Sequence, residues 1–152
     1  NVGVVCVVHQ LAQPVTPNFW VNISDPTIDA PGFVEFSNLR PLDRHIVYVP
    51  YYMPADNPAF GRPDESFIEE SFGYLQRVNA ALSASDRIAS HVARLRYAQP
   101  VCDVGFADKI PDPQTPVAGL QIADTCFYYP EDRGVSESIG YARRLVESLP
   151  RA

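Results

Sequence analysis

The sequence GLQIADTCFYYPEDRGVSESIGYARRLVESL, residues 119–149, decides the fold that we expect for the C-terminal part of the chain. Residues 119–123 are mostly apolar and predict a short strand. Residues 125–134 are rich in tyrosine and in charge, which predicts a loop. Apolar residues then recur every three or four positions through 135–149, which predicts a helix. The stretch is therefore expected to form a strand, a loop and a helix that begins beside Gly134.

The glycine at this helix start has two interpretations. The free N–H groups of a helix N-terminus bind anionic or electron-rich oxygen, and Gly134 has no Cβ to keep a flat ligand away from the backbone. Glycine is also an ordinary residue at a helix start, with no ligand involved. The local pattern leaves both interpretations open.

Upstream of this stretch, β-branched and aromatic residues predict five further strands, at 2–11, 19–23, 33–36, 45–52 and 88–98. Val2–Leu11 is apolar almost throughout, so we expect it to be buried on both faces. Pro50 has no N–H to donate, which predicts an edge or a bulge within 45–52.

One helix is predicted before residue 99. Asp64 is a good N-cap candidate, and apolar side chains recur at helical spacing from Phe67 to Val78, so the helix should span about 64–80. Proline-rich loops are expected at 54–63 and 100–116. This order predicts an α+β fold, with a mostly antiparallel or mixed sheet and a flanking helix.

The composition argues against several classes of protein. The net charge of −6 disfavours a nucleic-acid partner. The longest apolar run, Val4–Val8, is too short to span a bilayer, so no transmembrane segment is expected. The chain starts at Asn1 and its single methionine is Met53, which suggests a piece of a longer protein.

The metal- and disulfide-forming residues are widely spaced. Three cysteines (Cys6, Cys102 and Cys126) do not form the pattern of a disulfide framework or a zinc site, and His9, His45 and His91 are similarly scattered. We therefore expect no metal site and three reduced cysteines. Reduced cysteines indicate a reducing compartment, and the predicted localisation is cytoplasmic.

Residues 119–149 resemble the C-terminal FAD-binding motif of the amine oxidase superfamily of flavoproteins, in which a strand leads through a loop to a glycine at a helix start. The wording Tyr-Pro-Glu-Asp-Arg-Gly at 129–134 is most similar to protoporphyrinogen oxidase-like proteins. The resemblance implies contacts to FAD from the strand end and from the helix start. The residues at these places are Gly119, Ala123, Asp124, Gly134, Val135 and Ser136.

The resemblance also implies a division of the chain and a fold like the C-terminal part of the FAD-linked reductases. Residues 1–98 would be a portion of the substrate-binding domain. Residues 99–152 would cross back and supply the last strand, loop and helix of the FAD-binding domain. Tyr48, Tyr51 and Tyr52 are candidates for lining a substrate cavity, although aromatic core residues give the same pattern. No catalytic acid or base is identified.

Three departures from the family pattern shape the expectations. The family's strand end usually reads Ala-Gly before an acidic residue, whereas Asp124 follows Ala123 directly. Val135 stands where amine oxidases place an aromatic residue, and this second departure argues against a simple amine substrate. The Gly-x-Gly-x-x-Gly pyrophosphate cradle does not occur in the sequence. The chain alone is therefore expected to be inactive and to bind FAD weakly or not at all.

The resemblance implies an FAD-dependent oxidoreductase that oxidises a C–H or C–N bond of a small-molecule substrate by transfer to flavin. Two alternatives remain: a non-catalytic module that binds a ligand or a protein, and a flavin-dependent isomerase similar to the sugar mutases. Self-association is also expected, through an apolar stripe along the last helix. Its members are Val135, Ile139, Ala142, Val146 and Leu149.

Overall fold

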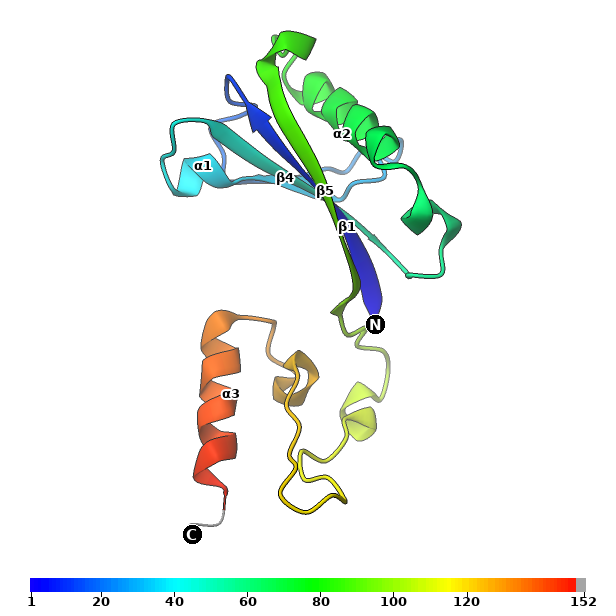
Figure 1. Cartoon of the computed structure of the whole chain (residues 1–152), viewed down its shortest axis with the longest axis vertical. Helices are drawn as coiled ribbons and strands as arrows, with labels where there is room; N and C mark the ends of the chain where they lie inside the picture. Colours follow the sequence, from blue (N-terminus) through cyan, green and yellow to red (C-terminus); the bar gives the residue numbers. More distant parts are fainter. Residues whose placement is uncertain (150–152) are drawn as a thin grey trace. The chain divides into compact units, whose positions relative to one another are not determined.

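The computed structural model describes residues 1–149 of the chain. The chain divides into two compact units, Asn1–Ala98 and Gln99–Ala152, which are described separately below (Figure 1). The roles that the sequence predicts for the two parts, in binding substrate and in binding FAD, stay predictions.

Within the described residues, the first unit is built on one five-stranded sheet in the order β2-β3-β4-β1-β5. The strands are β1 Val2–Leu11, β2 Trp20–Asn22, β3 Gly32–Glu35, β4 His45–Met53 and β5 Arg87–Gln99. Its helices are α1 Phe36–Leu39 and α2 Asp64–Val78, with short 3-10 turns η1 Pro58–Gly61 and η2 Ala84–Asp86. The pairs β1–β4, β2–β3 and β3–β4 are antiparallel, which confirms the α+β class with a mostly antiparallel sheet.

The expectation that Val2–Leu11 is buried on both faces is wrong. Burial alternates along β1, where Val5, Val7 and Leu11 are buried while Val4 and Val8 are half-buried. The reason is that α2 covers one face of the sheet (Figure 1). A run of β-branched residues suits a pleated strand on either face, so its composition did not reveal that one face stays open.

The core lies between α2 and the covered face of the sheet. The rings of Tyr51 and Phe67 are 5.1 Å apart at a steep angle, and Phe67 is fully buried. Phe72 and Leu75 follow at helical spacing and are also buried, whereas Val78 is 41% exposed. The predicted apolar face of the helix is therefore confirmed over its first three turns.

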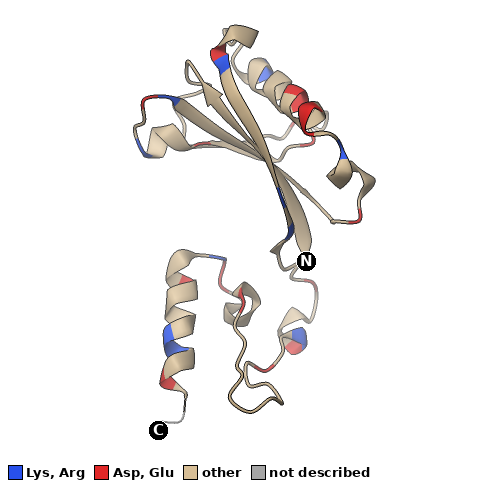
Figure 2. Ribbon diagram, viewed as in Figure 1, with Lys and Arg blue, Asp and Glu red and all other residues tan. Residues whose placement is uncertain are grey.

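The ends of α2 differ slightly from the prediction. Asp64 is the first helical residue rather than the N-cap, which is Pro63. Acidic residues nevertheless cluster at the start of α2 and a basic residue lies in its last turn (Figure 2), as the helix dipole favours. Arg94 of β5 fixes this start, because it pairs with Asp64 and donates to the carbonyl oxygens of Phe60 and Arg62.

Pro50 is accommodated inside β4. It pairs with Cys6 of β1, but the ladder from β3 reaches only Val47 and Tyr48. On the side away from β1, β4 therefore has no β3 partner at Pro50. This agrees with the local edge that a missing N–H predicts.

A buried histidine joins three elements of the first unit. His9 of β1 is fully buried, and its ring nitrogens lie 2.8 Å from Ser71 Oγ of α2 and 2.8 Å from Ser90 Oγ of β5. Burial, followed by the charge of Arg87, lowers the pKa of His9 to about 4. The ring is therefore neutral at physiological pH and acts as a hydrogen-bonding bridge.

The second unit contains α3 Val135–Glu147 and the 3-10 turns η3 Phe106–Lys109 and η4 Thr125–Tyr128. The strand predicted at 119–123 is wrong. This segment makes one isolated bridge, from Gln121 to Gln114, and Gly119 has a φ of +79° that breaks the extended backbone. A strand needs a continuous partner, and the neighbouring 113–115 segment provides only a few hydrogen bonds.

The apolar stripe of α3 is exposed, as the sequence predicted. Val135 is 78% exposed, and Ile139 and Val146 are each about two-thirds exposed. Self-association through this stripe stays a prediction. None of the helices within residues 1–149 is both long and apolar enough to cross a membrane.

The buried His9 should make the stability of the chain sensitive to acid. The unfolded chain gains a proton at His9 near its ordinary pKa of 6.5, whereas the folded chain resists protonation down to about 4. The free energy of unfolding should therefore fall by about 1.4 kcal/mol for each pH unit in this window as the pH decreases. Urea unfolding followed by circular dichroism at a series of pH values measures it.

His9→Gln removes the titrating ring and should flatten this part of the pH dependence. His91→Asn is a matched control, because His91 is exposed on β5, and it should unfold as the wild type does. If His9→Gln and the wild type lost stability in parallel, the effect would have to come from other groups.

Candidate functional site

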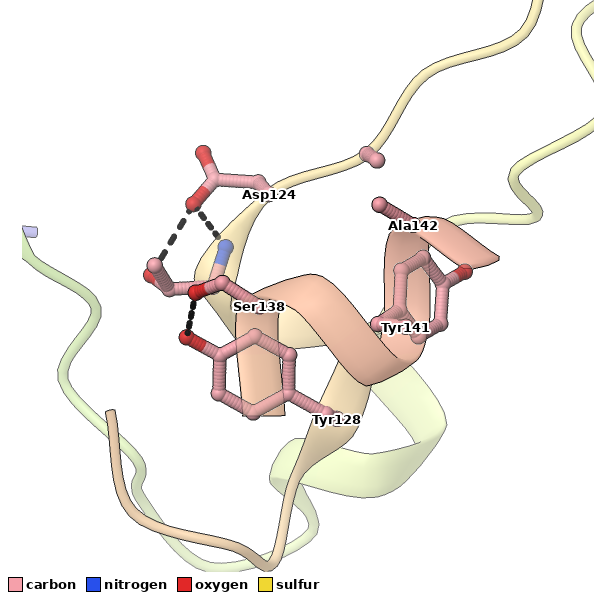
Figure 3. Close-up of a pocket in the computed structure, with 7 residues that line it drawn as sticks. Asp124, Tyr128, Ser138, Tyr141 and Ala142 are labelled. Atoms are coloured by element: carbon pink, nitrogen blue, oxygen red, sulfur yellow. Dashed lines mark hydrogen bonds between the residues drawn. The ribbon is translucent and has the colours of Figure 1, made fainter. Parts of the chain in front are cut away.

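A hollow of about 320 Å³ lies between η4, the residues before it, and one side of α3 (Figure 3). It is lined by Ala123, Asp124, Thr125, Tyr128, Ser138, Tyr141 and Ala142. Residues 123–128 form one wall and the first turns of α3 form the other. The hollow therefore depends on the contacts that hold η4 against α3.

Tyr128 and Ser138 make the central contact of this wall. The Tyr128 side chain is buried, and its hydroxyl lies 3.1 Å from Ser138 Oγ. Ser138 Oγ also donates to the carbonyl oxygen of Gly134 at 2.8 Å. Tyr141 packs on both Phe127 and Tyr128, with ring centroids 5.6 and 6.4 Å apart. These contacts position the helix start against η4.

Asp124 caps η4. Its Oδ1 accepts hydrogen bonds from the backbone N–H and from the hydroxyl of Thr125 (Figure 3). These two bonds fix the direction of the chain as it enters the turn. A carboxylate has further acceptor capacity, and the side chain is exposed, so Asp124 can also accept a bond from a ligand hydroxyl.

The start of α3 borders a second hollow of about 380 Å³, which includes Gly134, Val135 and Arg133. Both hollows share Thr125, Tyr128 and Ser138, so they adjoin at the Tyr128–Ser138 contact.

The space above Gly134 is already used by a flexible side chain. Gly134 has a φ of −142°, which any residue adopts, so its backbone does not require glycine. A Cβ built there would clash with Glu137 Oε2. The Glu137 carboxylate therefore folds back over Gly134, and it would have to move for either a larger residue or a ligand to approach the backbone.

The structure brings most of the predicted cofactor residues together. Ala123 and Asp124 line the first hollow, and Gly134 and Val135 line the second. Ser136 lies in the first turn of α3 and lines neither of these two hollows. Gly119 also lines neither. Tyr128, Ser138 and Tyr141 were missed, although the three-residue spacing of the last two indicated that they share one face of the helix.

The predicted substrate residues separate onto two faces of the sheet. Tyr48 is half-buried on the open face, where its ring meets Phe36 at 6.1 Å, and Tyr52 is 46% exposed. Tyr51 points to the other face and is buried against α2. Burial there, followed by the charge of Glu70, raises the pKa of Tyr51. Tyr48 and Tyr52 therefore share the open face of the sheet, and Tyr51 does not.

No protein-family model matches the chain, and no curated protein matches it. Among solved structures, the fold is similar to that of a protein from Exiguobacterium sp. 255-15 proposed to be a protoporphyrinogen oxidase. The TM-score is 0.59 and the sequence identity is 14%, so the similarity concerns the fold. The match covers 71% of this chain and 25% of the other chain, so the matched part spans about a quarter of that protein's length.

The Tyr128–Ser138 contact should stabilise the start of α3. Tyr128→Phe removes the hydroxyl and should destabilise the second unit by about 1 kcal/mol, the usual net value of such a hydrogen bond. Amide hydrogen exchange should then be faster in the first turns of α3. Tyr129→Phe is the matched control, because Tyr129 is 40% exposed, and it should leave this exchange unchanged. If Tyr128→Phe exchanged at the same rate as Tyr129→Phe and the wild type, the contact would contribute nothing to the stability of the helix start.

Proposed function

We propose that this chain is the C-terminal portion of an FAD-dependent oxidoreductase. In this proposal the second unit supplies part of the flavin site and the first unit supplies part of the substrate-binding domain. One observation carries the proposal. Four of the residues that the family resemblance assigns to FAD, Ala123, Asp124, Gly134 and Val135, border two adjoining hollows beside one helix start.

The helix start fits a flat, electron-rich ligand. The first N–H groups of an α-helix have no intrahelical partner, and the helix dipole favours negative charge there. Glu137 is a carboxylate at the end of a flexible chain, so the space that it occupies over Gly134 can be vacated. A bound FAD would supply the acceptor for electrons from a C–H or C–N bond.

The residues of this chain would then hold and orient the ligand. Asp124 can accept a hydrogen bond from a ribityl hydroxyl, and the N–H groups of Val135 and Ser136 can donate to the electron-rich edge of the ring. Tyr128 and Ser138 keep η4 and α3 at a fixed separation. These are positioning tasks, and no residue of the described part is assigned as an acid or base.

The open face of the sheet supports an apolar substrate. Tyr48 and Tyr52 lie on it beside Val4 and Val8 of β1, because Val4 pairs with Tyr52 and Val8 pairs with Tyr48. On β5, Leu95 and Tyr97 are 57% and 69% exposed. Val135, at the position of the amine oxidase aromatic, favours a substrate other than a simple amine.

A binding module without chemistry is a second candidate, and the exposed stripe of α3 agrees with it as well as with the oxidoreductase. Such a stripe needs another apolar surface, which a protein partner or the remainder of a flavin domain would provide equally well. The sugar mutase-like isomerase shares the proposed flavin site, and turnover of sugar nucleotides would distinguish it from the oxidoreductase.

Gly134→Val in the full-length protein tests the flavin site. The extended backbone at Gly134 accepts valine, and the Cβ displaces only the Glu137 carboxylate, so the chain should still fold. The branched side chain should block the ligand, and flavin content after gel filtration should fall at least about tenfold, corresponding to about 1.4 kcal/mol of lost affinity.

Gly61→Val is the control, because a Cβ at Gly61 meets no atom within 4 Å, and this variant should keep its flavin. Circular dichroism verifies that both variants are folded. A folded Gly134→Val protein that retained its FAD and its turnover would contradict the assignment of the helix start.

The stripe on α3 should cause the isolated chain to self-associate. Sedimentation velocity over a wide concentration range should show dimers or larger species, and the double variant Ile139→Glu with Val146→Glu should shift them to monomers. Val117→Glu is a matched control, because Val117 is also exposed in the second unit but lies outside the stripe. A wild-type chain that stayed monomeric throughout would count against association.

A further inference from the structure

Two of the three cysteines share one small hollow in the second unit. The hollow, of about 90 Å³, lies where residues 99–102 meet η4 and residues 131–133, and both Cys102 and Cys126 line it. Close by along the chain, Phe106 of η3 contacts Tyr129, the residue after η4, with ring centroids 5.2 Å apart. Cys6, in contrast, belongs to β1 of the first unit.

The two thiols differ in their surroundings. Cys102 is exposed, whereas Cys126 is half-buried. Burial raises the pKa of Cys126, and the charges of Asp124 and of Cys102 raise it further. This influence of Cys102 on Cys126 agrees with the hollow that the two residues share. The exposed thiol should react with a dissolved oxidant first, and the sheltered thiol should react second.

We propose that Cys102 and Cys126 form a reversible disulfide when the chain meets hydrogen peroxide. The Cys102 thiol attacks one peroxide oxygen, the O–O bond breaks, and a sulfenic acid and one water result. The Cys126 sulfur then attacks the Cys102 sulfur, forming the S–S bond while the sulfenic hydroxyl leaves with a proton as a second water. The two sulfurs together supply two electrons, and one peroxide is reduced.

The segment that carries Cys102 is exposed from Val101 to Gly105. A disulfide requires the two Cα atoms to be about 4.4–6.8 Å apart, so any larger separation would have to be closed by movement of this segment toward η4. Its neighbours Val101 and Val104 are 58% and 98% exposed, so few packing contacts oppose this movement. The bond would tether η4, which supplies Thr125 and Tyr128 to both larger hollows.

Peptide mapping of the 152-residue chain tests the proposal. The folded chain is treated with a small excess of hydrogen peroxide, the remaining thiols are alkylated, and the protein is digested with trypsin. Lys109 separates the two cysteines, so the disulfide should appear as one linked pair of peptides, 97–109 with 110–133. Cys6 should stay alkylated, and dithiothreitol should release the pair.

Three comparisons show whether the folded geometry directs the bond. Cys6→Ser should leave the linked pair unchanged, and Cys102→Ser should abolish it. In concentrated urea the wild type should lose this selectivity and give a mixture of pairings among its three cysteines. The urea comparison needs no variant, so a poorly folding Cys102→Ser protein would not obscure the result.

The proposal would be overturned by three results in the folded chain. Any one of them suffices: disulfides mainly between two copies of the chain, disulfides that involve Cys6, or oxidation of Cys102 to sulfinic acid while Cys126 can still be alkylated. The inference does not depend on the flavin proposal, because the reaction requires only the two thiols and peroxide.

Discussion

The packing of α2 on one face of the sheet determines most of the first unit. Phe67, Phe72 and Leu75 fill the space above β1 and β4, and their burial supplies the main favourable free energy of this unit. Inside this apolar layer, His9 provides polar contacts that connect β1 to α2 and β5. Because a buried polar group is stable only with partners, these bonds fix how α2 lies on the strands.

Much of this fold could be predicted from the sequence, because its elements carry local signals. The apolar spacing from Phe67 to Leu75 identified α2, and the β-branched runs identified β1 and β4 within a residue or so. The open face of β1 could not be predicted, because β-branched residues occupy both sides of the strand. The segment 119–123 has the composition of a strand, but a strand forms only with a partner, and the sequence does not show which partner is available.

The candidate site could also be predicted only in part from the sequence. The family resemblance selected Ala123, Asp124, Gly134 and Val135, and the structure brings these four residues to adjoining hollows. Tyr128 and Ser138 could not be predicted, because they contact each other only after η4 packs against α3. That packing is a tertiary contact with no local signal in the sequence. Strand alternation alone could have separated Tyr51 from Tyr48 and Tyr52, since side chains at odd spacing point to opposite faces.

The one-sided burial of the sheet has a consequence for how such a sequence can evolve. On β1, odd-numbered positions such as Val5 and Val7 are constrained by a close-packed interior, where a change of one methylene group is felt. The even-numbered positions between them, such as Val4 and Val8, are only half-buried and make fewer contacts with that interior. Substitutions at alternate codons along one strand should therefore differ in their cost to stability, and the half-buried positions can change their chemistry while the same fold is kept.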